Sequence, residues 1–274
     1  MQAIALEKVS KQYPLFTLDN VSFTLPMGSV MGFIGENGAG KSTTIRLILD
    51  LIRPDSGTIQ VFEGGPLDRE HIGVVFDECS FPETLNARDV GRIMAAGYKT
   101  WSKARYADYL KRFRLPEKKK ISDYSRGMKM KLAIATALSH DSRLLILDEA
   151  TSGLDPVVRD EILDIFYDFM QDETHAILMS SHITTDLEKI CDYITFIHEG
   201  KIVFSEEKDI IREKFGVLRC DETTLRNLDS AAVYGVRRSS VSIEVLVERA
   251  LIPSSLVVDP VTLDEMMVLI AKED

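Results

Sequence analysis

A glycine-rich segment directly after a short apolar stretch constrains the fold of this chain more than any other feature. Gly35 to Ser42 fit the pattern G-x-x-x-x-G-K-[ST], between the apolar segment Val30–Ile34 and helical apolar spacing over Thr44–Ile52. In such a strand–loop–helix unit, backbone N–H groups surround phosphates, the Lys reaches the β and γ oxygens and the Ser ligates Mg²⁺. A plain glycine turn would not need this context. The predicted nucleotide-binding residues are Gly35, Glu36, Asn37, Gly38, Ala39, Gly40, Lys41, Ser42 and Thr43.

The composition is that of a folded globular protein. The 274 residues are 45% hydrophobic, and 33 Lys and Arg against 43 Asp and Glu give a formal net charge of −10. No apolar run reaches the length of a membrane span, and the charged beginning lacks the apolar region of a signal peptide. Cys79, Cys191 and Cys220 lie too far apart for a zinc ribbon or redox pair and fit a reducing cytosol. The acidic balance argues against a nucleic-acid-coating protein.

Strand and helix patterns alternate over most of the chain, which predicts an α/β protein with a largely parallel sheet. Two short strands are expected around a turn at Tyr13-Pro14, and helices over Thr44–Ile52, Pro156–Met170 and up to Cys191. The predicted strands are Ala3–Val9, Val21–Leu25, Val30–Ile34, Thr58–Phe62, Ile72–Phe76, Leu144–Leu147, Ala176–Met179, Tyr193–Ile197 and Lys201–Phe204.

Two parts of the chain depart from this alternation. From Thr84 to about His140, apolar residues recur at spacings of three and four, which predicts a helical insertion. After about Phe215, β-like runs such as Val241–Val247 and a last helix, Leu263–Ala271, predict a small α+β module. The expected domains are therefore residues 1–215, with a helical subdomain at about 84–140, and residues 216–274.

Two adjacent carboxylates follow the apolar strand Leu144–Leu147. Asp148 can hold Mg²⁺ through water, and Glu149 can face the γ-phosphate and polarise an attacking water. Acidic residues commonly lie at strand ends, so the pair alone is only moderately specific for a nucleotide site. The phosphate loop upstream makes the signal strong. Together they predict a site for nucleotide hydrolysis.

These motifs resemble the nucleotide-binding subunit of an ATP-binding-cassette (ABC) transporter, over roughly residues 3 to 215. Tyr124–Met128 resembles the family signature, Ser152–Asp155 its D-loop, His182 its switch histidine and Tyr13 the aromatic that stacks on adenine. Taken alone, His182 would be an ordinary histidine and Tyr13 a packing residue. The resemblance implies the ABC form of the P-loop NTPase fold, with an N-terminal antiparallel β subdomain.

The family mechanism assigns further roles to matching residues. ATP lies between the phosphate loop of one subunit and the signature of a second, where Ser125 and Gly127 grip the γ-phosphate beside the D-loop residue Asp155. Lys41 neutralises phosphate charge, and His182 positions the γ-phosphate. The resemblance implies ATP and Mg²⁺ as cofactors, with Ser42, Asp148 and Asp77 as expected metal ligands and Lys41, Asp77, Glu149 and His182 as expected catalytic residues.

Two departures from the family pattern stand out. The signature reads Tyr-Ser-Arg-Gly-Met instead of Leu-Ser-Gly-Gly-Gln, and it keeps Ser125 and Gly127. Asp77 stands where the family has a Gln that reaches Mg²⁺ and the attacking water. A carboxylate can ligate Mg²⁺, but it adds negative charge beside ATP. Because Glu149 and His182 are both present, we interpret the chain as a working variant rather than a dead site.

The resemblance implies a subunit that dimerises on ATP and drives export of a drug, peptide antibiotic or lipid. It implies two partners, a separate multi-span permease and a second ATPase subunit, more readily an identical copy than a different one. The protein is expected in the cytoplasm, peripherally on the inner face of the cell membrane, without nucleic acid. One alternative is a non-transport ABC ATPase that signals to a membrane partner. Another, a soluble ABC ATPase acting on nucleic acid or ribosomes, is disfavoured because only 84 residues without heptads separate Lys41 from Ser125.

A basic run lies within the predicted helical insertion. Lys111–Lys120 contains Arg112, Arg114 and three consecutive lysines. Most such runs are solvated faces. A contact with acidic lipid headgroups or a permease loop is the alternative, because the family docks its membrane partner beside this insertion.

Overall fold

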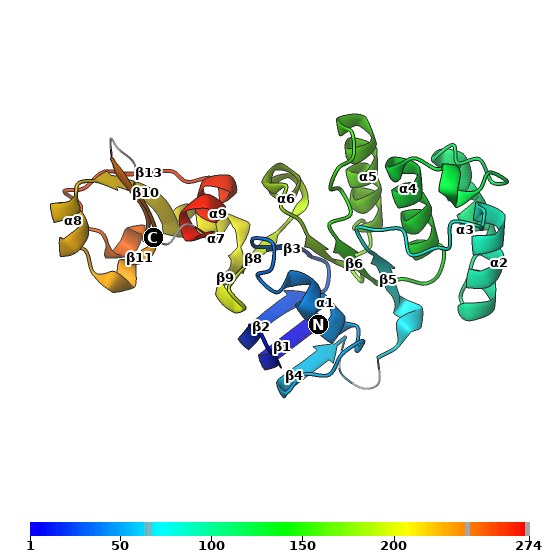
Figure 1. Ribbon diagram of the computed structural model, residues 1–274, viewed down its shortest axis with the longest axis horizontal. Helices are drawn as coiled ribbons and strands as arrows, with labels where there is room; N and C mark the ends of the chain where they lie inside the picture. The colour runs from blue at the N-terminus through cyan, green and yellow to red at the C-terminus, as the bar shows by residue number, and fades with distance from the viewer. Residues whose placement is uncertain (63, 65–66, 239–241, 272–274) are drawn as a thin grey trace.

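The computed structural model describes residues 1–62, 64, 67–238 and 242–271, and its centre is a six-stranded sheet (Figure 1). The strand order is β5-β6-β7-β3-β8-β9, parallel except for the antiparallel pair β8 and β9. The strands are β3 (Val30–Ile34), β5 (Ile72–Val75), β6 (Leu144–Asp148), β7 (Ala176–Ser180), β8 (Tyr193–His198) and β9 (Lys201–Glu207). The α/β prediction with a largely parallel sheet is confirmed.

The three central strands are buried along their whole length, since every residue of β3, β6 and β7 is buried. Such continuous apolar runs form where helices cover both faces of a parallel sheet. Two of these strands, β3 and β6, end at the glycine loop and at Asp148. Parallel pairing therefore brings the loop and the acidic residues to the same edge of the sheet.

The N-terminal part forms a separate antiparallel sheet in the order β2-β1-β4. Its strands are β1 (Gln2–Tyr13), β2 (Phe16–Pro26) and β4 (Ser56–Val61), and the first two are longer than predicted. The predicted turn is found one residue later, at Pro14-Leu15, with Tyr13 paired to Phe16. Helix α1 (Lys41–Ile48) shares one apolar core with this sheet and the central sheet.

The helical insertion consists of α2 (Ala87–Gly97), α3 (Lys103–Arg112) and α4 (Arg126–Ala137). Each helix begins after an N-cap side chain, Asn86, Ser102 or Ser125, whose oxygen accepts a hydrogen bond from a backbone N–H of the first turn. Short 3₁₀ turns lie at Arg69–His71, Ile121–Asp123, Ser230–Ala232 and Arg249–Leu251.

Helices α5 (Pro156–Phe169) and α6 (Thr184–Ile190) follow β6 and β7, close to the predicted bounds. Helix α1 begins three residues before the predicted start and ends four residues early. In the described part of the chain, no helix combines the length and the apolar character that crossing a bilayer requires.

The C-terminal part has its own four-stranded antiparallel sheet, in the order β11-β12-β10-β13. The elements are α7 (Lys208–Lys214), β10 (Phe215–Cys220), α8 (Glu222–Asn227), β11 (Val233–Arg238), β12 (Ile243–Glu248), β13 (Val258–Asp259) and α9 (Leu263–Ala271). The predicted small α+β module is thus present, although Val241, where one strand was expected to begin, lies outside the described residues. A boundary between two domains near residue 215 stays a proposal.

The C-terminal module packs onto the rest of the chain through Phe215. Its ring is fully buried, 5.4 Å from the ring of Phe204 in β9 and 4.8 Å, edge-on, from that of Tyr234 in β11. The apolar residues of α9 belong to the same core cluster as those of α5 and α6. The module and the preceding part of the chain therefore share one core.

We expect Phe215→Ala to destabilise the whole chain by about 3–5 kcal/mol, because it empties a fully buried aromatic site in this shared core. Chemical denaturation followed by circular dichroism measures the change. Exposed Val257→Ala in the same module is the control and should change the unfolding free energy by less than about 0.5 kcal/mol. A loss below about 1 kcal/mol for Phe215→Ala would contradict the shared core.

Candidate functional site

The phosphate loop, Gly35 to Thr43, joins β3 to α1 and is braced from behind by the turn between β8 and β9. The Gly200 N–H donates to the Ala39 carbonyl at 3.0 Å. A Cβ placed on Gly35 would lie 2.2 Å from the Ile197 carbonyl oxygen. The first glycine of the motif is therefore required by its close packing against β8, whether or not a ligand is bound.

Lys41 is buried inside this loop. Its Nζ donates to the Gly35 carbonyl at 2.7 Å and to the Glu36 carbonyl at 3.2 Å, and it lies 3.8 Å from a Glu149 carboxylate oxygen. Burial lowers the pKa of Lys41 below its ordinary value, and the nearby carboxylates of Glu149 and Asp148 partly oppose this shift. The ammonium is thus held where incoming phosphate oxygens can replace the loop carbonyls as its partners.

Asp148, the last residue of β6, and Glu149, which follows it, are both held by Ser180 at the end of β7. The Ser180 hydroxyl donates to Asp148 Oδ1 at 2.6 Å, and the Glu149 N–H contacts the Ser180 side-chain and carbonyl oxygens at 3.1 Å each. Glu149 has a φ of +54°, a conformation that non-glycine residues seldom adopt and that occurs often at functional sites. His182 Nδ1 lies 2.6 Å from Glu149 Oε2. The structure therefore brings the predicted Lys41, Asp148, Glu149 and His182 together.

A pocket of about 260 Å³ opens over the phosphate loop. Asp77 lines it, so the residue that replaces the usual Gln lies at the nucleotide site. Tyr13 is not among the lining residues, and the aromatic that is present is Phe16, its cross-strand partner in the β1–β2 hairpin. Adenine stacking by Tyr13 stays a prediction. The pocket is lined by Phe16, Glu36, Asn37, Gly38, Gly40, Lys41, Ser42, Thr43, Asp77 and Glu149.

The side chains around this pocket fit a Mg²⁺ ion that is bound together with phosphates. Ser42, in the first turn of α1, is exposed to the pocket, and Asp77 lines the same space. Asp148 keeps a buried carboxylate with one oxygen held by Ser180. Mg²⁺ usually takes one or two carboxylates and completes its shell with phosphate oxygens and water. No group of three or more His, Cys, Asp or Glu among the described residues forms a metal cage by itself.

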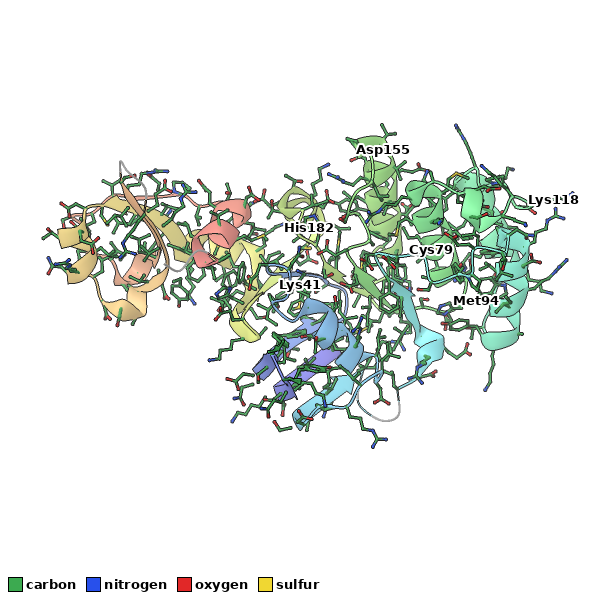
Figure 2. All side chains as sticks on the ribbon, in the orientation of Figure 1. Lys41, Cys79, Met94, Lys118, Asp155 and His182 are labelled. Carbon is green, nitrogen blue, oxygen red and sulfur yellow. The ribbon has the colours of Figure 1, made fainter. Side chains whose placement is uncertain are left out.

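The predicted signature and D-loop residues lie apart from this pocket. Ser125 caps α4 and is exposed, and Gly127 follows in the first turn of that helix. Asp155 caps α5, and Figure 2 shows it well separated from Lys41 and His182. The two segments contact each other, since a Cβ on Gly153 would lie 2.9 Å from the Arg126 guanidinium. Within one chain, Ser125, Gly127 and Asp155 therefore do not join the phosphate loop.

Three contributors to the site had not been predicted from the sequence. Phe16 lines the pocket, Ser180 positions both acidic residues, and His198 Nδ1 lies 3.0 Å from the carboxylate of Glu36 in the phosphate loop. Burial alone would raise the pKa of Glu36, but the contact with His198 and backbone hydrogen bonds lower it overall. The Ser-Ser-His sequence after β7 offered a signal for Ser180, whereas His198 could be found only from the fold.

Known proteins resemble this chain in sequence and in fold. The sequence pattern of the family described as ABC transporter matches residues 18–152, and that of an AAA domain matches residues 120–185. A lantibiotic transport ATP-binding protein of Streptococcus pyogenes is 35% identical over 212 residues, covering 75% of this chain and 91% of that protein. A bacitracin transport ATP-binding protein of Bacillus licheniformis is 36% identical over 68% of this chain and 63% of that protein. A solved ATP-binding subunit of an ABC transporter superimposes with a TM-score of 0.70 at 29% identity, covering 77% of this chain and 92% of the other.

We expect Gly35→Ala to weaken nucleotide binding strongly, because its Cβ would collide with the Ile197 carbonyl and displace the phosphate loop. Titration with a fluorescent ATP analogue should show at least a tenfold weaker affinity. Gly97→Ala, at the end of α2, is the control, since its Cβ meets open space. Unchanged affinity in Gly35→Ala would show that the loop tolerates the shift.

Proposed function

This chain belongs to the ATP-binding subunits of the ABC transporter family, and we propose that it powers export through a separate membrane-spanning permease. The observation that carries the proposal is a cluster in which Lys41 and Glu149 line the phosphate-loop pocket and His182 contacts the Glu149 carboxylate. The names of two relatives, which transport a lantibiotic and bacitracin, support export of a peptide antibiotic or a similar amphipathic molecule. Like its family, the chain is an ATPase.

The geometry suggests how hydrolysis proceeds. Lys41 neutralises charge on the β and γ phosphates, and the loop N–H groups orient them. Glu149 accepts a hydrogen bond from the attacking water and draws its proton, while His182, already 2.6 Å from Glu149, keeps that carboxylate aligned and faces the γ-phosphate. Ser42, Asp77 and Asp148 would hold Mg²⁺, which supplies further charge neutralisation to the phosphates.

The separation of Ser125 and Gly127 from the pocket supports action as a dimer. The N-terminus of α4 exposes Ser125 and carries the partial positive charge of a helix end, which suits a phosphate. In a head-to-tail pair, the signature of one subunit would close over the pocket of the other, with Asp155 alongside. We propose that the second subunit is an identical copy, because this chain carries both halves of such a site.

We further propose that the protein lies in the cytoplasm against the inner face of the membrane, held there by the permease. We propose that the permease selects the transported molecule. Signalling to a membrane partner without transport would use the same ATP chemistry, and the identity of the partner separates the two functions.

We expect Glu149→Gln to bind ATP with unchanged affinity while the steady-state ATPase rate falls by about 10²–10⁴-fold, because the amide cannot accept the water's proton. The variant should also accumulate as an ATP-bound dimer, which light scattering after gel filtration would detect. Glu78→Gln is the control with near-normal turnover, because Glu78 lines the neighbouring groove toward α4 and not the phosphate-loop pocket. Normal turnover in Glu149→Gln would remove this residue from the role of base.

Purification of the tagged chain from detergent-solubilised native membranes tests whether a membrane-spanning permease is its partner. We expect a multi-span protein in fixed stoichiometry that raises the ATPase rate severalfold, and reconstituted vesicles should then move a substrate only when ATP is present. The Glu149→Gln variant should retain the partner and lose transport. Recovery of a stimulating membrane partner with no transport of any tested peptide, drug or lipid would favour signalling, and recovery with ribosomes would contradict both.

A further inference from the structure

Charge is distributed very unevenly between the helical insertion and the rest of the chain. Residues 84–140 contain 14 Lys and Arg against four Asp and Glu, whereas the remaining residues contain 19 against 39. The insertion is thus strongly positive in a protein of net charge −10. We propose that an exposed part of it, the basic tip, binds the anionic phospholipid surface of the membrane. The basic tip is defined as Lys111, Arg114, Lys118, Lys119 and Lys120.

The charges of the basic tip are available for a partner. All five side chains belong to exposed residues. No ion pair involves any of them in the part of the chain that the structure describes, which includes the whole insertion. Neighbouring cations are already paired, Arg88 with Glu117 at 2.8 Å and Arg112 with Asp168 at 3.0 Å. The insertion's other cations without an ion pair are Lys99, Lys103, Arg105 and Arg126, so five of its nine unpaired cations lie within the tip segment 111–120.

The segment that carries the three lysines is held in place by its own packing. Phe113 and Leu115 are buried, and the Tyr124 hydroxyl donates to the Pro116 carbonyl at 2.8 Å. The Lys119 N–H donates to the same carbonyl at 3.1 Å, and Lys120 forms an antiparallel bridge with Asn86. The lysines are thus presented from a fixed turn, so little backbone entropy opposes binding.

The basic tip also lies at one end of the molecule. Figure 2 places Lys118 at the outer edge of the insertion, and Figure 1 places the C-terminal module at the opposite end. A flat anionic surface can contact this end while most of the acidic body stays farther away than the screening length, about 8 Å at physiological ionic strength. A planar surface therefore avoids the repulsion that a long flexible polyanion would meet along the body.

Lipid is favoured over nucleic acid by the lack of a stacking surface at the tip. Proteins that bind single strands combine a basic groove with exposed aromatic rings. Phe113 and Tyr124 are buried, and the Tyr124 hydroxyl already donates to the Pro116 carbonyl. Tyr109 is half-buried, and its ring is stacked on that of Phe113. Clusters of four to eight Lys and Arg without such rings are typical of segments that bind anionic lipid headgroups.

This inference goes beyond the proposed ATPase and relies on it in one respect, since a membrane-embedded permease would bring the chain to a lipid surface. The lipid contact would then orient each subunit against the bilayer, independently of the permease interface. Binding of the chain to protein-free vesicles tests the lipid contact in the absence of any permease.

The experiment is vesicle flotation of the full-length protein with phosphatidylcholine alone or with 30% phosphatidylglycerol, at low and at high salt. We expect binding only to the anionic vesicles and only at low salt. The variant Lys118→Gln, Lys119→Gln, Lys120→Gln should bind on the order of a hundredfold more weakly. A matched variant, Lys8→Gln, Lys189→Gln, Lys201→Gln, removes the same charge from exposed lysines of the acidic body and should bind as well as wild type or better.

Several outcomes would overturn the inference. These are absence of binding to anionic vesicles, equal binding to neutral vesicles, equal losses in both triple variants, or preferential binding to a single-stranded RNA of matched charge concentration. Thermal melting of each variant excludes unfolding as the cause. ATPase activity without vesicles is measured in parallel. A protein that hydrolyses ATP and ignores anionic vesicles overturns the lipid contact alone, whereas one that binds vesicles without hydrolysing ATP overturns the proposed function alone.

Discussion

The buried ammonium of Lys41 is the interaction on which the site depends. A buried charge is tolerated only when partners replace its lost water, and here two loop carbonyls and the Glu149 carboxylate do so. Holding those carbonyls requires the loop to press against β8, which in turn requires glycine at position 35. Holding Glu149 requires Ser180 at the end of β7. The order of strands in the central sheet is therefore what assembles the charge balance of the pocket.

Local sequence patterns made much of the nucleotide-binding pocket predictable. The phosphate loop, the strand before it and the acidic pair at the end of β6 are contiguous motifs, so their elements could be placed before any contact was known. The roles of Ser180, Phe16 and His198 depend on which strands become neighbours, and sequence spacing does not encode that choice. Boundaries were less accurate for the same reason, since β1 extends to Tyr13 by pairing with β2 rather than by its own apolar pattern.

The two departures from the family pattern, Asp77 and the altered signature that contains Arg126, lie close together in the fold. Asp77 and Arg126 line one groove of about 430 Å³ between the phosphate-loop side of the chain and α4. Relative to the usual Gln and Gly, one substitution adds a negative charge and the other a positive charge. The charges of these two substitutions therefore offset each other, in a groove that is also lined by Glu78, Glu83 and Lys129. The Arg126 guanidinium also lies against Gly153 of the D-loop. A change at one position alone would leave the groove with an extra charge.

The C-terminal module also packs against α6, the helix that follows His182. This seven-residue helix follows His182 and is too short to be stable by itself, so its position depends on packing. Its Leu187 and Ile190 enter the shared core with α9, and the Thr184 hydroxyl donates to Asp264 at 3.3 Å. His182 lies two residues before α6 begins, so the tail, which carries none of the nucleotide motifs, supports the helix next to the histidine.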